Sequence, residues 1–214
     1  MIVRSMIKNA SLILSILKKA YPTAHIALRY HTPWELLVAV ILSAQCTDVT
    51  VNKVTETLFA KYPTIDAYIH ADSAAFEKDI KSTGFYHDKA KHILAAATYI
   101  KGHVPKTMED MLKIPGVGRK TANVVLGNAY GIVEGIAVDT HVMRLVERLQ
   151  LVSKNAYKNP IKIEQELMAI IPKKDWFTVT YVLIDHGRAV CHAKNPNCAG
   201  CVVEKLCPSS RLHG

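Results

Sequence analysis

The sequence has no run of about 20 consecutive apolar residues, the length that a helix needs to cross the hydrocarbon core of a membrane. The apolar run near the N-terminus, Leu12–Leu17, is interrupted by Ser15, ends at Lys18 and Lys19, and lacks a clear small-residue cleavage site. We therefore expect neither a membrane span nor an export signal. The apolar residues of this segment instead follow the spacing of one helix face, which predicts an amphipathic helix packed on the body of the protein. These residues are Met6, Ile7, Ala10, Ile13, Leu14 and Leu17.

Acidic residues are scarce relative to basic ones. The 214-residue chain has 18 Asp and Glu against 27 Lys and Arg, which gives a net charge of +9 and a pI near 9.3. A surplus of this size suits a polyanionic partner, nucleic acid first and an anionic membrane surface second, although it also serves solubility alone. Apolar residues make up 50% of the chain and charged residues 21%, so a packed core is expected and wholesale disorder is excluded.

Strand patterns, internal repeats and low-complexity linkers are also lacking. Segments rich in β-branched residues, such as Val38–Leu42, sit inside helical 3.6-residue patterns. Helix start and stop signals recur along the chain, and an all-α protein in two lobes is the simplest interpretation. The expected signals are a cap at Thr32 with Pro33 and a capping-box Glu35, a cap at Asp48 for a helix to about Lys61, a cap at Asp72 or Ser73, a helix over about 88–101 ended by Gly102, a short helix opened by Thr107 and Asp110, a start at Asn159-Pro160, and a last helix over about 175–189.

A proline and two glycines separate two helical patterns at residues 114–118, IPGVG. The proline ends the first helix, and the glycines permit backbone conformations that other residues avoid. Such a turn can point N–H groups at a phosphate at the positive end of the next helix dipole. We therefore expect Gly116, Val117 and Gly118 to grip a nucleic-acid backbone without reading its sequence. A plain tight interhelical turn is the alternative.

Four of the five cysteines lie within 17 residues, in the spacing C-x6-C-x2-C-x5-C. Since no export signal is expected, disulfides are a poor explanation for this group. Four thiolates at Cys191, Cys198, Cys201 and Cys207 can hold one tetrahedral zinc ion or one [4Fe–4S] cluster. The spacing alone does not choose between these two.

Several motifs together resemble one known family. Residues 112–126, LKIPGVGRKTANVVL, followed by Ala137–His141, resemble the helix–hairpin–helix and aspartate signature of the endonuclease III family. Further segments match that family in order, and the resemblance covers nearly the whole chain. These segments are Ser43–Gln45, Thr47-Asp48, Thr83-Gly84, His186–Arg188 and the cysteine group.

The resemblance implies an all-α, two-lobed helix–hairpin–helix DNA glycosylase fold with an active-site cleft between the lobes. Residues 26–135 would form a six-helix, barrel-like domain that carries the helix–hairpin–helix at 107–130. Residues 1–25 together with 136–214 would form a helical domain that carries a [4Fe–4S] cluster at 191–207. The cluster is expected to fold the C-terminal tail rather than to take part in redox catalysis.

The resemblance also implies a bifunctional base excision repair enzyme that removes oxidised or ring-damaged pyrimidines and nicks the strand 3′ to the abasic site. In this chemistry Lys120 attacks C1′ as the base leaves, and Asp139 stabilises positive charge on the sugar. Lys120 falls in the first turn of the second hairpin helix, where the dipole and nearby cations disfavour its ammonium form. A lysine that contacts phosphate or only solvent is the alternative.

Chain geometry permits Asp139 to return to the start of the lysine helix. A helix of about 12 residues carries the chain roughly 18 Å, and the eight residues 131–138 can span about 26 Å. The segment is therefore long enough to bring Asp139 beside Lys120, but its length does not show that the two residues meet. The other interpretation is that Asp139 only caps a helix over Thr140–Leu149.

The remaining expected contacts concern DNA. By resemblance, Gln45 enters the space left by the extruded nucleotide, Phe85 acts as an apolar wedge, and Lys194 contacts a phosphate. A core position for Phe85 and an ordinary surface glutamine are the alternatives. The expected partner is double-stranded DNA with damaged pyrimidines or abasic sites, bound by a cytoplasmic, monomeric protein. A monofunctional glycosylase for another lesion and a non-catalytic DNA-binding iron–sulfur protein remain the competing functions.

Overall fold

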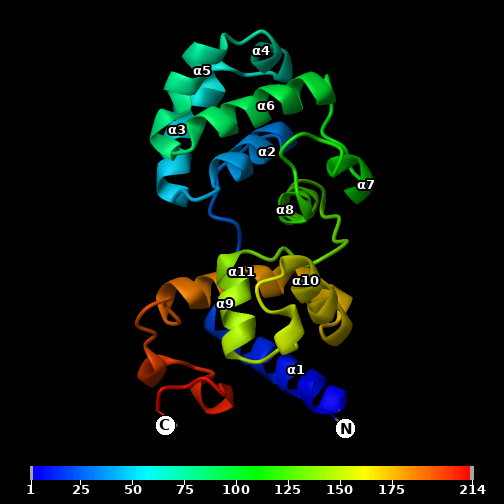
Figure 1. Ribbon diagram of the computed structural model, residues 1–214, viewed down its shortest axis with the longest axis vertical. Helices are drawn as coiled ribbons and strands as arrows, with labels where there is room; N and C mark the ends of the chain where they lie inside the picture. The colour runs from blue at the N-terminus through cyan, green and yellow to red at the C-terminus, as the bar shows by residue number, and fades with distance from the viewer. Residues whose placement is uncertain (1, 213–214) are drawn as a thin grey trace. The chain divides into compact units, whose positions relative to one another are not determined.

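The computed structural model describes the backbone of residues 2–212 and the side chains of residues 9–212. Every regular element in that range is a helix, so the predicted all-α class is confirmed (Figure 1). The chain divides into two compact units, residues 27–134 and residues 1–26 together with 135–214.

The unit of residues 27–134 is built on a helix that is apolar on all sides. Helix α2 is buried from Trp34 to Leu42 apart from Glu35, and it contacts α3, α6 and α8. A helix that is hydrophobic all round has to be a core element. The helices of this unit are α2 (Pro33–Leu42), α3 (Asp48–Lys61), α4 (Ile65–Ile69), α5 (Ser73–Ile80), α6 (Tyr86–Ile100), α7 (Met108–Met111) and α8 (Arg119–Tyr130), with a 3-10 turn at Lys81–Thr83.

The predicted helix starts of this unit follow from local capping. Thr32 accepts the Glu35 N–H at 3.1 Å, and the Glu35 carboxylate accepts the N–H of His31 at 2.6 Å, one residue before the capping-box position. Asp72 rather than Ser73 caps α5. The predicted cap at Asp48 is wrong, because Thr47 accepts the Thr50 N–H and Asp48 is already the first residue of α3.

Helix α6 ends differently from the prediction. It runs to Ile100, and the left-handed position that closes it is Lys101 at φ 49°, not Gly102. The left-handed residue that closes a helix is usually glycine, which is why the sequence predicted Gly102 rather than Lys101 at this position.

The second unit packs its helices around one aliphatic core. Its helices are α1 (Ile2–Ala20), α9 (Thr140–Arg148), α10 (Pro160–Ile170) and α11 (Trp176–Ala189), with 3-10 turns at Lys154–Ala156, Lys173–Asp175, Cys198–Gly200 and Glu204–Leu206. Helix α11 contacts both α1 and α9. At Gly187 an added Cβ would lie 2.8 Å from Nδ1 of His141 and 2.9 Å from Nη2 of Arg144, so glycine allows α9 and α11 this close approach.

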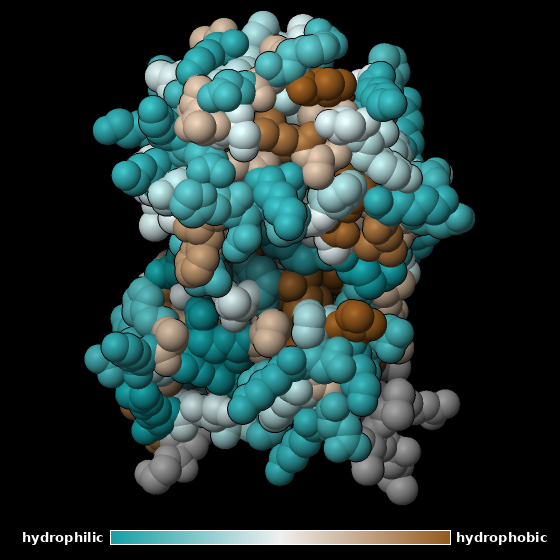
Figure 2. Space-filling view, turned by 45° about the horizontal axis from the view of Figure 1, so that its top comes forward, coloured by the Kyte–Doolittle hydropathy of each residue, from teal (hydrophilic) through white to brown (hydrophobic). Residues whose placement is uncertain are grey.

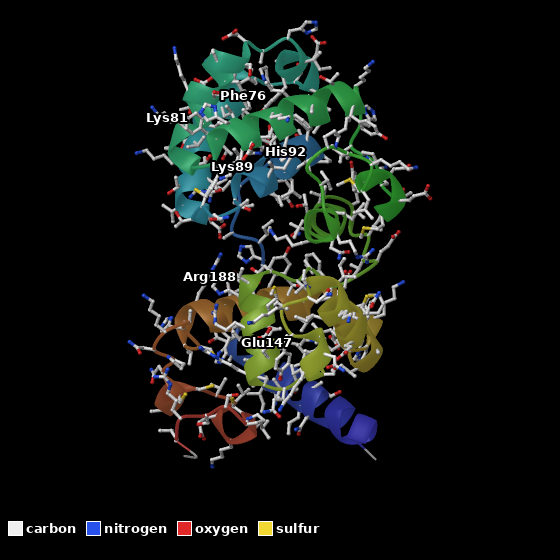
Figure 3. All side chains as sticks on the ribbon, in the orientation of Figure 1. Phe76, Lys81, Lys89, His92, Glu147 and Arg188 are labelled. Atoms are coloured by element: carbon white, nitrogen blue, oxygen red, sulfur yellow. The ribbon has the colours of Figure 1, made fainter. Side chains whose placement is uncertain are left out.

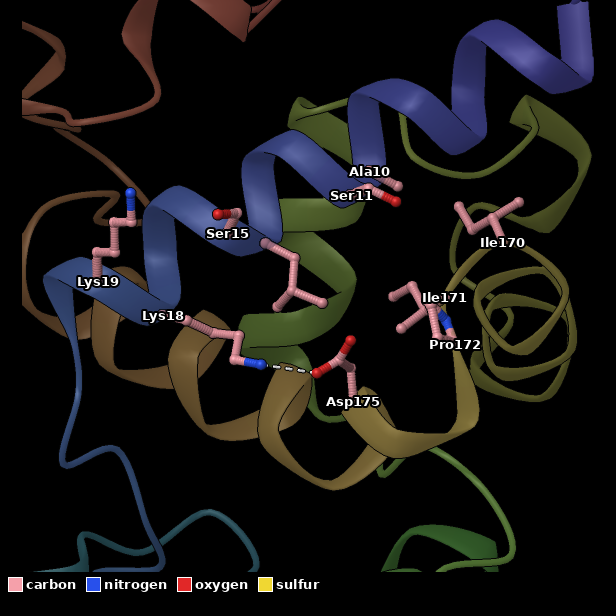
Figure 4. Close-up of a pocket in the computed structure, with 10 residues that line it drawn as sticks. Ala10, Ser11, Ser15, Lys18, Lys19, Ile170, Ile171, Pro172 and Asp175 are labelled. Atoms are coloured by element: carbon pink, nitrogen blue, oxygen red, sulfur yellow. Dashed lines mark hydrogen bonds and ion pairs between the residues drawn. The ribbon is translucent and has the colours of Figure 1, made fainter.

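Helix α1 is amphipathic as predicted. Its buried face is formed by Ala10, Ile13, Leu14 and Leu17, while the side chains of Met6 and Ile7 lie outside the described residues. The Lys18 ammonium pairs with the Asp175 carboxylate at 2.7 Å at one edge of a surface pocket of about 350 Å³ beside α1 (Figure 4). No residue of this pocket is among the predicted site residues.

Polar side chains dominate the face of the molecule in Figure 2, and hydrophobic ones form separate patches on it. In the part of the chain that the structure describes, no helix combines the length and apolarity of a membrane span.

Candidate active site and cysteine cavity

The turn between α7 and α8 has the form of a hairpin closed by its own backbone. The Val117 N–H donates to the Ile114 carbonyl at 3.1 Å, and the Val117 side chain is buried. Gly118 then occupies the N-cap position of α8 and provides no side chain to cap the first-turn amides. The first turn of α8 contains no acidic residue and begins with Arg119 and Lys120. This helix start therefore favours an anion at its positive end.

The two glycines of the hairpin have different roles. Gly116 has φ +77°, and a Cβ there would lie 2.7 Å from Cβ of His92 on α6, so both conformation and packing demand glycine. The expectation of a special backbone conformation is wrong for Gly118, which has φ −99° and ψ 175°, extended values open to any residue. No atom lies within 4 Å of an added Cβ at Gly118, so a side chain there would project into open space.

We expect Gly116→Ala and Gly118→Ala to separate folding from DNA binding. Gly116→Ala should lower the free energy of unfolding by about 2–4 kcal/mol, because left-handed strain and the clash with His92 add. Gly118→Ala should leave stability nearly unchanged but weaken DNA binding, because its methyl group occupies the space before the α8 amides. Urea unfolding and fluorescence anisotropy with duplex DNA measure the two effects. Equal DNA affinity for Gly118→Ala and the unaltered protein would place the phosphate elsewhere.

Lys120 and Asp139 both stand at helix starts. Lys120 is the second residue of α8 and is half-buried. Asp139 is the N-cap of α9, where its Oδ1 accepts the Val142 N–H at 2.8 Å. The capping role expected for Asp139 is thus confirmed, and the cap engages only one of its two carboxylate oxygens. The helix that it caps ends at Arg148, one residue before the predicted end.

Gln45 and Phe85 share an unusual backbone state. Gln45 has φ 52° and Phe85 has φ 48°, and both side chains are exposed, Phe85 by 63%. The left-handed region is rare for residues other than glycine and costs of order 1–3 kcal/mol each, a strain that concentrates at functional sites. The exposure of Phe85 excludes the alternative that it is a core aromatic residue.

The four clustered cysteines line one cavity. Cys191, Cys198, Cys201 and Cys207 line a small cavity of about 30 Å³ together with Arg148. Burial and the neighbouring thiols raise the pKa of Cys201 and of Cys207 above the usual thiol value. Four thiolates gathered in this way therefore need a cationic group between them to be stable.

The thiol donor set is one that two kinds of metal group use. Four cysteine thiolates can hold one tetrahedral zinc ion or one [4Fe–4S] cluster. Among the described residues, no group of three or more His, Cys, Asp or Glu side chains is placed so that it could hold a metal ion.

Three comparisons relate this chain to known proteins. A family model described as HhH-GPD superfamily base excision DNA repair protein matches residues 38–173. Endonuclease III from Synechocystis sp. is 50% identical, with 95% of this chain and 94% of the relative covered. Endonuclease III from Bacillus subtilis is 44% identical, with 87% and 86% covered. The chain belongs to the endonuclease III family.

A solved structure extends this relationship to three dimensions. It is described as a trapped endonuclease III–DNA covalent intermediate with an estranged adenine, and it is 40% identical to this chain, with a TM-score of 0.91 and coverage of 97% and 98%. The predicted family and its fold are therefore confirmed for this member of the endonuclease III family.

Arg148 lines the cysteine cavity, and the sequence alone did not single it out. Its guanidinium donates to Cys191 Sγ at 3.1 Å and to the carbonyls of His192 and Ala193 at 2.8 and 2.7 Å. It therefore holds the start of the loop that carries Lys194, which is exposed. On the sequence Arg148 resembles any charged residue at a helix end, so no local signal marked it.

His186 is a second residue beside the cysteines to which the sequence alone assigned no role. It is 1% exposed, and its Nε2 lies 3.4 Å from Cys201 Sγ while its Nδ1 lies 3.0 Å from the Tyr21 hydroxyl. It joins the segment after α1 to the cysteine loop. In the sequence, His186 and Gly187 match the family, and the match gives them no role.

Proposed function

We propose that this member of the endonuclease III family is a bifunctional base excision repair enzyme, a DNA glycosylase and abasic-site lyase acting on double-stranded DNA. The observation that carries the proposal is Lys120 in the first turn of a glycine-capped hairpin helix, in a chain that matches a relative trapped covalently on DNA along 97% of its length. We assign oxidised or ring-damaged pyrimidines as the substrate class.

In the proposed reaction the Lys120 amine forms a bond to C1′ of deoxyribose while the glycosidic bond breaks and the base leaves with a proton. Loss of the amine proton and opening of the sugar ring then give a Schiff base. The Schiff base acidifies the 2′ protons, and loss of one of them expels the 3′ phosphate by β-elimination. Nucleophilic lysine chemistry of this kind requires the free amine, which the positive helix end favours.

We assign Asp139 the stabilisation of positive charge on that sugar. Its carboxylate is held by the Val142 N–H, so its position is set by the start of α9 rather than by a flexible side chain. A preorganised carboxylate of this kind stabilises a cationic transition state without reorganising.

We assign the gripping of DNA to the hairpin and the exposed loops. Gly116, Val117 and Gly118 would present the hairpin to a phosphate, with the amides around Gly118 as the donors, since Val117 already donates to Ile114. Gln45 and Phe85 would enter the DNA duplex at the place that the extruded, damaged nucleotide leaves. Lys194 would contact a phosphate of the DNA backbone. A monomeric, cytoplasmic enzyme remains the prediction.

We assign a [4Fe–4S] cluster to Cys191, Cys198, Cys201 and Cys207. The donor set, the shared cavity and the raised thiol pKa values of Cys201 and Cys207 fit a group that supplies positive charge. When bound, the cluster would cross-link the C-terminal tail to the end of α11 and to Arg148.

Purified protein should be brown and contain about four iron atoms per chain, with no zinc. Cys201→Ser should lose most of the iron and lower the melting temperature, because metal binding contributes to folding. Cys46→Ser is the matched control and should keep its iron, since Cys46 does not line the cavity. Metal analysis and visible absorbance measure both. A colourless, zinc-loaded protein of full activity would overturn the assignment.

The test of the function is a duplex with a single thymine glycol, incubated with and without borohydride. The expected results are release of the base, a nick 3′ to the abasic site, and a covalent protein–DNA adduct on reduction. Base release without nicking would indicate a monofunctional glycosylase. Binding without base release or adduct would indicate a non-catalytic DNA-binding protein.

A further inference from the structure

Lys89 on α6 is a buried lysine without an acidic partner. Its side chain is 4% exposed, and lysine is almost never buried to this degree unless it is paired. In the described part of the chain no carboxylate forms an ion pair with it. Its Nζ instead donates to the Leu42 carbonyl and to the Thr83 carbonyl, both at 2.8 Å. Burial lowers the pKa of Lys89, because desolvation disfavours the charged ammonium group.

The first of these carbonyls belongs to the end of α2. The helix stops at Leu42 because the Cys46 N–H turns back to the Ser43 carbonyl at 3.2 Å instead of continuing the helical pattern. The Leu42 carbonyl thereby loses its regular donor, and the ammonium group takes that place at the negative end of the helix dipole. Gln45, with its left-handed backbone, follows three residues later.

The second carbonyl lies two residues before Phe85. Thr83 is itself held in place, because its hydroxyl donates to the Ile80 carbonyl at 2.8 Å. The backbone N–H of Lys89 also donates to the Phe85 carbonyl at 3.1 Å. Lys89 therefore holds the chain on both sides of the strained residue Phe85, and its ammonium connects that segment to the end of α2.

One amino group thus joins two loops that are 41 residues apart in sequence and that carry Gln45 and Phe85. Residues other than glycine keep a left-handed backbone conformation only where surrounding contacts hold them in it. Figure 3 shows Lys89 on α6, on the side of that helix that faces α2.

We propose that Lys89 is a positioning residue that presents Gln45 and Phe85 to DNA as one rigid pair, so that extrusion of the damaged nucleotide depends on it. The inference rests on the proposed roles of Gln45 and Phe85. Lys89 does not touch the reacting atoms in this proposal. Its loss should therefore slow the opening of the duplex and leave the bond-breaking chemistry intact.

The test compares single-turnover base excision from two substrates, a lesion paired in a duplex and the same lesion in a single strand that needs no opening. Lys89→Met should slow excision from the duplex roughly 10- to 100-fold, because small losses of alignment have effects of this size. Excision from the single strand should change less than about threefold. A fluorescent base analogue opposite the lesion should report slower opening in the same proportion.

Lys91→Met is the matched control, since Lys91 is exposed on the same helix, and its duplex-to-single-strand ratio should equal that of the unaltered protein. Lys89→Gln keeps a donor for one of the two carbonyls. It should slow excision from the duplex less than Lys89→Met does, and again more than excision from the single strand. This variant provides the test if Lys89→Met does not fold. Equal slowing on both substrates, or no slowing, would overturn the proposal. If the unaltered protein excises nothing from either substrate, the proposed function fails instead.

Discussion

Lys120→Gln is expected to abolish the borohydride-trapped adduct and to lower base release by about 10³-fold or more, because the only proposed nucleophile is gone. Glutamine has a similar helix propensity and nearly the same length, so α8 and its hairpin should stay intact. Affinity for duplex DNA should fall little, since one positive charge among 27 basic residues is removed. Denaturing gels after reduction measure the adduct, and anisotropy measures the affinity.

The matched control is Lys162→Gln, which removes the same charge from an exposed position on α10. It should retain full trapping. An adduct yield for Lys120→Gln equal to that of the control would refute the nucleophile role. Mass spectrometry of the reduced, digested adduct should find the sugar remnant on the peptide that contains Lys120.

Asp139→Asn is expected to separate the two roles of Asp139. Asparagine caps a helix about as well as aspartate, so its side-chain oxygen can still accept the Val142 N–H and the free energy of unfolding should hardly change. The negative charge is lost, and base release should fall by about 10²- to 10⁴-fold. Single-turnover kinetics and urea unfolding measure the two effects.

Asp139→Ala provides the comparison. It should lose the same catalytic factor and, in addition, about 1 kcal/mol of unfolding free energy, because the α9 cap is removed. If Asp139→Asn instead retains the full rate while Asp139→Ala only loses stability, Asp139 serves as a cap and has no part in the chemistry.

Elements whose causes are local were predictable. Thr32, Thr107 and Asn159 cap the helices that their sequence context indicated, because a cap is a contact between residues two or three positions apart. Errors arose where two neighbouring residues could serve equally. Thr47 rather than Asp48 caps α3, and Lys101 rather than Gly102 takes the left-handed position after α6.

The residues of the candidate site also fall into those that the sequence could suggest and those that it could not. Lys120 and Asp139 could be proposed because both lie in segments that resemble the family's signature, and the four cysteines could be grouped because their spacing is short. Lys89, Arg148 and His186 could not, because each bonds a carbonyl, thiol or hydroxyl group at least 43 residues away in sequence. Every residue has a backbone carbonyl, so the residue type does not show which carbonyl accepts a hydrogen bond. No sequence pattern therefore identifies the side chain that donates to it.

The amino-acid sequence by itself determined the helical class, the hairpin at residues 114–118 and the close spacing of four cysteines, since these depend on neighbouring residues. Only the tertiary structure decided that Gly116 is needed for its approach to His92 while Gly118 leaves open space. It also decided that one buried ammonium joins the Gln45 and Phe85 loops. The physical reason is that burial and long-range hydrogen bonds arise only when distant segments are packed together.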